Sequence, residues 1–152
     1  MFNNYENILD YFYVKRDITL NKNYIIKEVI KLGKSVLIDK SSEFAIGAVV
    51  LAKKLNNLKQ FQISEQLLRS ATSIGANIRE GRYAQSKKDF THKMSIALKE
   101  CHETIYWLKL IVDGKIIDDE ETLKLYKSSY DILRMLVSTV NTSKHTKSRK
   151  EK

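Results

Sequence analysis

The chain has 152 residues with no proline and only five glycines, which is one ordinary domain's length and a composition that favours helix over sheet. Apolar residues make up 43% and charged residues 30%, enough for a packed core and a hydrated exterior. The longest apolar run, residues 44–52, is far shorter than the roughly 20 residues of a membrane-spanning helix. The N-terminus has acidic residues where a secretory signal has basic ones. We therefore expect a cytoplasmic protein without a membrane span.

Residues 1–40 show no single period. YENILDYFYV is compatible with a short helix, and YIIKEVIKLGKSVLI with either a helix or an extended strand. We expect these residues to form an N-terminal appendage whose structure the sequence leaves open.

Two segments with helical period follow. The first extends from residue 42 to about residue 58, and the second from about residue 64 to residue 80, with Gly81 as a candidate stop. Apolar residues recur at steps of three and four, which places them on one face of each helix. These expected core residues are Phe44, Ala48, Leu51, Leu55 and Leu58 in the first helix and Leu67, Ala71, Ile74 and Ile78 in the second.

Two more helices are expected beyond Gly81. The third opens with Ser86, whose side chain can cap the helix while Asp89 reaches back, and it ends at Gly114. The fourth begins at Asp118 with DDEE, because acidic residues are favourable at a helix N-terminus, and it ends beyond Asn141. The expected core residues of the third helix are Phe90, Met94, Ala97, Cys101, Ile105, Leu108 and Val112. Those of the fourth helix are Leu123, Tyr126, Tyr130, Leu133, Val137 and Val140.

Short links between long amphipathic helices make neighbouring helices antiparallel. The sequence therefore predicts an all-α fold, an up-down antiparallel four-helix bundle over residues 41–143. Apolar residues stop after this point, so residues 144–152 are expected to form a disordered basic tail.

The net charge of +9 is unevenly distributed. Residues 69–99 carry seven basic and two acidic side chains, whereas residues 100–131 carry four basic and eight acidic ones. The first region is a candidate anion-binding surface, in which Tyr83 offers a ring for stacking. The alternative is a hydrated surface without a ligand. The candidate nucleic-acid-binding residues are Arg69, Arg79, Arg82, Lys87, Lys88 and Lys93.

Small side chains gather on the second helix and allow another backbone to approach closely. The sequence is compatible with tight packing inside the bundle and with a contact between subunits. Asn77 and Glu80, one turn apart, suit local capping or a hydrogen bond between subunits. The candidate subunit-interface residues are Thr72, Ser73, Gly75, Ala76, Asn77 and Glu80.

We expect no enzyme, no metal site and no cofactor. Asp89 and His92 could share a helix face, but a diiron site needs a second such pair and two further carboxylates. The four residues of ECHE, 100–103, diverge around a helix axis and cannot converge on one metal. Cys101 lies on the apolar stripe, which favours a buried structural thiol.

One part of the chain resembles a known family. LLRSATSIGANIREG, then QSKKDF, then SIALKECHETIYWLKLI resembles the bacterial four helix bundle protein family. This family includes proteins encoded in intervening sequences of large-subunit ribosomal RNA genes and accessory variability proteins of diversity-generating retroelements. Its pattern SI-x-ANI-x-EG is matched by Ser73, Ile74, Ala76, Asn77, Ile78, Glu80 and Gly81.

The resemblance implies a homopentameric barrel and, in the retroelement branch, nucleic-acid binding through basic surface residues. It implies no enzyme. The expected function is therefore that of a non-enzymatic oligomer that binds RNA or DNA electrostatically. The most specific version of this hypothesis is an accessory protein of a retroelement reverse transcriptase. The alternative is a protein-interaction scaffold without a nucleic-acid role.

Overall fold

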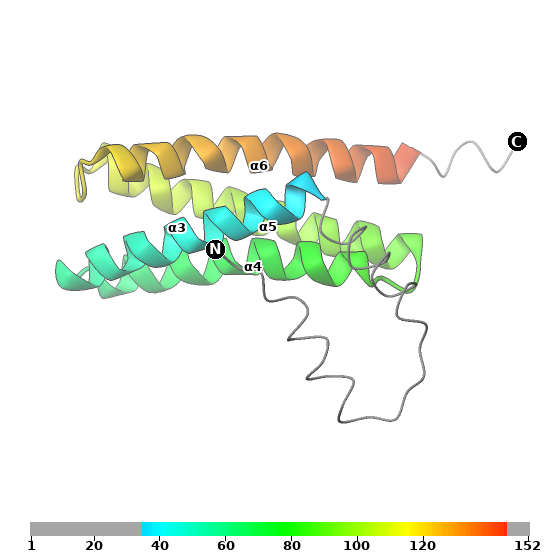
Figure 1. The fold of residues 1–152 in the computed structure, drawn as a ribbon, viewed down its shortest axis with the longest axis horizontal. Coiled ribbons are helices and arrows are strands. Elements are labelled where there is room, and N and C mark those ends of the chain that lie inside the picture. The colour runs from blue at the N-terminus through cyan, green and yellow to red at the C-terminus, as the bar shows by residue number, and fades with distance from the viewer. Residues whose placement is uncertain (1–34, 146–152) are drawn as a thin grey trace, which may run out of the picture. The chain divides into compact units, whose positions relative to one another are not determined.

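The structure is a computed structural model that describes residues 35–145, so the expected appendage up to residue 34 and the tail from residue 146 lie outside the described residues. Within residues 35–145, four helices run antiparallel in chain order, and the predicted all-α four-helix bundle is confirmed (Figure 1). The first helix begins earlier than expected, and the last extends to His145. The helices are α3 (Val36–Asn57), α4 (Phe61–Arg82), α5 (Lys87–Asp113) and α6 (Glu120–His145).

Each helix contributes one apolar face to a single core. α4 packs against both α3 and α5, α5 packs against α6, and the contact between α3 and α6 is the least extensive. The expected stripes of α3 and α4 are buried, except at Leu58, which is 52% exposed. That expectation was wrong because α3 ends at Asn57 and the chain turns at Lys59, whose φ is 58°. Within residues 35–145, no helix is both long and apolar enough to cross a bilayer.

The expected core stripe of α6 was also wrong. Of its members only Val140 is buried, whereas Leu123 is 40% and Val137 is 39% exposed. The buried face lies next to that stripe and includes polar side chains at Thr122 and Ser129, which lower its apolar character in the sequence. The residues on this buried face are Thr122, Leu125, Ser129, Ile132, Leu136, Val140 and Ser143.

The expected stripe of α5 is buried in its central part. Met94, Ala97, Cys101 and Leu108 are buried as predicted, with Thr104 and Ile111 completing the face. Phe90, Ile105 and Val112 are only half-buried at its edge.

Cys101 is a buried thiol whose Sγ lies 3.6 Å from the carbonyl oxygen of Ser129. Burial raises the pKa of this thiol to about 12, so it stays protonated near neutral pH. Its position on the buried face agrees with a structural role.

The start of α6 is anchored by one carboxylate. Asp119 Oδ1 accepts a hydrogen bond from the Thr122 N–H at 2.7 Å, and its carbonyl accepts one from the Leu123 N–H, which makes Asp119 the N-cap. Lys54 Nζ, on α3, lies 2.7 Å from Asp119 Oδ2. The Lys54 ammonium first, and then the Thr122 hydrogen bonds, lower the pKa of Asp119 to about 2.

Asp119→Ala is expected to destabilise the bundle by about 0.5–2 kcal/mol, because it removes the cap. Asp119→Asn keeps an acceptor for the cap but loses the charge. The folded pKa of Asp119 is below its ordinary 3.8, so its charge stabilises the fold above about pH 4 and ceases to do so as pH falls toward about 2. In thermal melts over that interval, the Asn variant should lose less stability than the parent. Equal losses would contradict this role.

Candidate nucleic-acid interface

The turn between α4 and α5 brings two helix ends together. Gly81 is buried against α5, and a Cβ at this position would lie 2.5 Å from Met94 Cε and 3.3 Å from Lys93 Cβ. α4 continues through Gly81 to Arg82, and no glycine among the described residues has a positive φ. The expected stop at Gly81 is therefore wrong: this glycine allows the two helices to approach, and the turn follows it.

Two of the six candidate cations are held by carboxylates of the same chain. Arg69 pairs with Glu103 and, at 3.6 Å, with Glu100, both on α5. Lys93 Nζ lies 2.6 Å from Glu80 Oε2. Hydrogen bonds to Glu103 and Glu80 raise the pKa of Arg69 and Lys93 respectively. Both cations stay charged, but the carboxylates weaken the attraction they offer to a phosphate.

The other four candidate cations lie at the ends of the two helices. Arg79 Nη2 donates a hydrogen bond to Ser42 Oγ at 2.9 Å and so connects α4 to α3. Arg82 is half-buried. Lys87 and Lys88 are exposed in the first turn of α5, and no ion pair holds either within residues 35–145. These two lysines are therefore the most accessible of the six to a polyanion.

The start of α5 is capped as the sequence predicted. Ser86 Oγ accepts a hydrogen bond from the Asp89 N–H at 3.1 Å, and Asp89 Oδ2 accepts one from the Gln85 N–H at 3.2 Å. The Asp89 carboxylate already balances the positive end of the helix dipole. Anion binding here would therefore depend on lysine side chains more than on free backbone N–H groups.

Two further residues belong to this end of the bundle. Tyr83, in the turn, is 73% exposed. The Thr91 hydroxyl on α5 donates to Ser143 Oγ on α6 at 3.1 Å, so the exposed Lys144 lies near the start of α5. From the sequence, Lys144 was expected in the tail and not in the site. The antiparallel order of the helices was the signal that could have found it.

The candidate interface residues of α4 lie on different sides of the helix. Gly75 faces α3, where a Cβ would lie 3.7 Å from Ser41. Asn77 Nδ2 donates to the carbonyl of Ser73 at 2.9 Å, which is a local hydrogen bond. Thr72 and Ala76 are exposed, so they are the members most open to another subunit.

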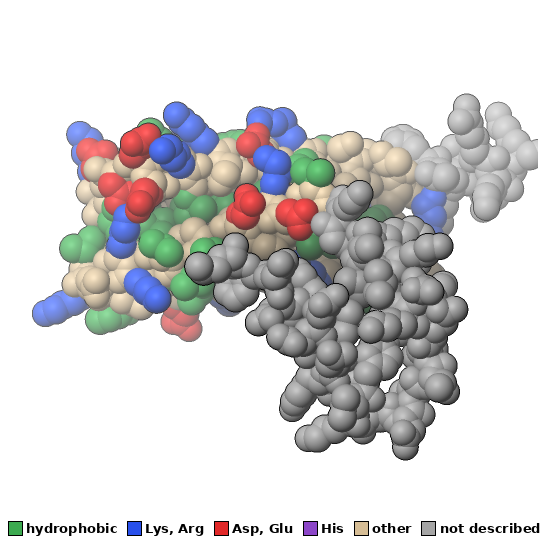
Figure 2. Space-filling view, in the orientation of Figure 1, with side chains coloured by type: hydrophobic (Ala, Val, Ile, Leu, Met, Phe, Trp, Pro, Cys, Tyr) green, Lys and Arg blue, Asp and Glu red, His purple; other side chains and the backbone are tan. Residues whose placement is uncertain are grey.

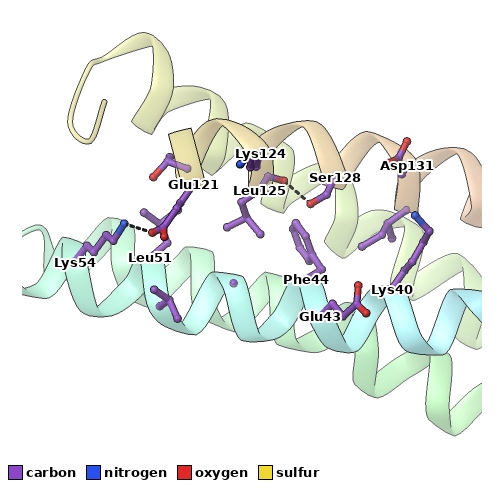
Figure 3. Close-up of a pocket in the computed structure, with 14 residues that line it drawn as sticks. Lys40, Glu43, Phe44, Leu51, Lys54, Glu121, Lys124, Leu125, Ser128 and Asp131 are labelled. Carbon is purple, nitrogen blue, oxygen red and sulfur yellow. Dashed lines mark hydrogen bonds and ion pairs between the residues drawn. The ribbon is translucent and has the colours of Figure 1, made fainter. Parts of the chain in front are cut away.

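A groove of about 400 Å³ lies between α3 and α6 (Figure 3). Phe44 and Leu125 line it, and Gly47 allows Leu125 to come close to α3, since a Cβ at Gly47 would lie 2.7 Å from Leu125 Cδ1. Lys54 pairs with Glu121 across one end at 2.7 Å. Figure 2 shows hydrophobic side chains at this place, between basic and acidic ones. No histidine or cysteine lines the groove.

Titratable side chains do not gather into a metal site in the described part of the chain, where no group of three or more His, Cys, Asp or Glu could hold an ion. His92 and His102 are exposed on α5.

Comparisons with known proteins agree with the fold. A solved structure of a protein with unknown function from the S23 ribosomal protein family of Bacteroides thetaiotaomicron is 48% identical, with a TM-score of 0.66. The match covers 69% of this chain and 98% of that one. No curated protein matches the chain. The family model of the 23S rRNA-intervening sequence protein matches residues 34–138, and the chain belongs to this family.

Proposed function

We propose that this chain is a non-enzymatic, cytoplasmic protein that assembles with copies of itself and binds nucleic acid, above all RNA, through electrostatic contacts. The observation that carries the proposal is the pair of exposed lysines, Lys87 and Lys88, at an end of the bundle that also presents Lys144. Lysines that neutralise phosphates give sequence-independent, salt-sensitive binding. The resemblance extends the proposal to an accessory role beside a retroelement reverse transcriptase, whose gene is then expected near that of this chain.

Self-association is supported by an apolar surface on α6. We define the α6 outer stripe as Leu123, Tyr126, Tyr130, Leu133 and Val137. Three of these residues are exposed, and the Tyr126 and Tyr130 hydroxyls lie 3.0 Å apart with their rings edge to face. Large apolar side chains that recur along an exposed helix face mark interaction surfaces more often than isolated ones do.

A closed ring of more than two copies needs two different surfaces on each copy. The α6 outer stripe is one candidate. The other is the outer face of α4 at Thr72 and Ala76, whose small side chains let a neighbouring helix come close. We propose that the α6 outer stripe of one copy packs on this α4 face of the next, in the pentameric ring that the resemblance implies.

The non-enzymatic part of the proposal rests on what the candidate reactive groups do. Asp89 caps α5, and Cys101 is buried with a raised pKa. A nucleophile needs an accessible, activated side chain with a base in hydrogen-bond reach. Asp89 instead accepts a hydrogen bond at the start of α5, and Cys101 packs in the core.

Binding is expected to weaken steeply as salt rises, since each phosphate contact releases counterions. Replacing Arg79, Arg82, Lys87 and Lys88 together by Gln should weaken binding at least about ten-fold, because every subunit loses the same contacts. The measurement is fluorescence anisotropy with a labelled RNA and a labelled DNA at two salt concentrations. If the parent binds neither at low salt, the scaffold function replaces this proposal.

A further inference from the structure

The end of α6 lies next to the start of α5. Ser143 is buried with its hydroxyl 3.1 Å from that of Thr91, in the second turn of α5. Lys144, the next residue, therefore lies at the same end of the bundle as Lys87 and Lys88, where α6 ends and α5 begins (Figure 1). Lys144 is more than 50 residues from Lys87 and Lys88 in sequence, but all three lie at one end of the bundle.

Charge differs between the two ends of the bundle. Among the described residues, the end that holds the α4–α5 turn carries Arg79, Arg82, Lys87, Lys88 and Lys144. At the opposite end, residues 118–121 are all acidic and begin α6. A polyanion is therefore attracted to the exposed cations of the first end, whereas at the second end the acidic residues balance nearby lysines, with Lys54 paired to both Asp119 and Glu121.

An aromatic ring stands among these cations. Tyr83 follows the end of α4, four residues before Lys87, and 73% of its surface is exposed. An unpaired base can stack on an exposed ring, whereas the bases of a duplex are already stacked on each other. The combination of a ring and lysines is the one that single-strand-binding proteins use.

We propose that this end of the bundle binds single-stranded nucleic acid, with Tyr83 stacking on a base and Lys87, Lys88 and Lys144 contacting phosphates. We call these four residues the basic end. The inference rests on the proposed function and adds the ligand's class and its place on the fold.

The test compares three variants of the full chain with a matched control. Lys87→Gln with Lys88→Gln, and Tyr83→Ala, change the basic end, and a deletion of 146–152 removes the charges that follow it. The control, Lys53→Gln with Lys59→Gln, removes the same charge from exposed sites at the opposite end. Circular dichroism verifies the fold of each variant. Anisotropy titrations use one labelled RNA as a single strand and as a duplex.

The double lysine variant should weaken single-strand binding about ten-fold and reduce its salt dependence, while the control stays near the parent. The deletion should weaken binding less than the double lysine variant does. Tyr83→Ala should weaken single-strand binding by roughly five- to 100-fold and duplex binding much less.

If the control variant binds the single strand as weakly as the double lysine variant does, the inference is overturned, because only the total charge of the protein would then matter. The proposed function would remain intact. A Tyr83→Ala variant that binds both forms as the parent does would overturn the single-strand assignment. If the parent binds neither form at low salt, the proposed function fails together with the inference.

Discussion

Leu136→Ala is expected to destabilise the protein by about 2–5 kcal/mol, whereas Leu123→Ala should cost less than about 1 kcal/mol. The substitution is the same at both positions, but Leu136 is 0% and Leu123 40% exposed. Truncating the buried side chain leaves a cavity among the four helices. Truncating the exposed one mostly removes atoms that water already touches.

Urea unfolding followed by circular dichroism at several protein concentrations measures both effects. Several protein concentrations are needed because self-association would add a contribution to the free energy of unfolding that grows with protein concentration. At the lowest concentration, the loss for Leu136→Ala should remain large and that for Leu123→Ala small. Equal losses that do not depend on concentration would show that both faces of α6 are buried in one copy.

Val137→Glu is expected to convert the assembled protein into monomers without unfolding it. Val137 is an exposed member of the α6 outer stripe, and burying an unpaired carboxylate in a subunit contact is strongly unfavourable. Ser138→Glu is the control, because it adds the same charge one residue away on another exposed side of α6. Light scattering after size-exclusion chromatography should show monomers for the first variant and the parent's size for the second.

The pairing of two different surfaces can be tested by mixing. Ala76→Glu, on the α4 face, should also give monomers. Each variant keeps one intact surface, so a mixture of Val137→Glu and Ala76→Glu should form heterodimers through the remaining α6 stripe and α4 face. A mixture that stays monomeric would contradict this pairing, and a monomeric parent would contradict self-association itself.

The fold follows closely from local patterns in the sequence. The absence of proline, the steps of three and four between apolar residues and the short links predicted four antiparallel helices, which the structure confirms. The cap at Ser86 was also predicted, because the side chain and the N–H that it accepts are three residues apart. Such features depend on neighbours along the chain, so the sequence alone is sufficient to find them.

The face that α6 buries could not be predicted in the same way. Two stripes with apolar residues lie side by side on this helix, and the one interrupted by Thr122 and Ser129 is the one that is buried. The choice depends on the rotation of α6 about its axis, which is set by packing against α3 and α5. In the core, Ser129 lies close to Cys101, so a small side chain there permits close approach. A hydrophobic pattern does not contain this information.

Part of the candidate site could likewise be predicted from the sequence, and part could not. The sequence shows which segments are basic and places Lys87 and Lys88 next to a helix start. The packing of the helices, in contrast, pairs Arg69 and Lys93 with carboxylates of α5 and α4 and brings Ser143, next to Lys144, to Thr91. The physical reason is that a charge acts over a few ångströms of space, and positions far apart in the chain become neighbours only when the helices pack.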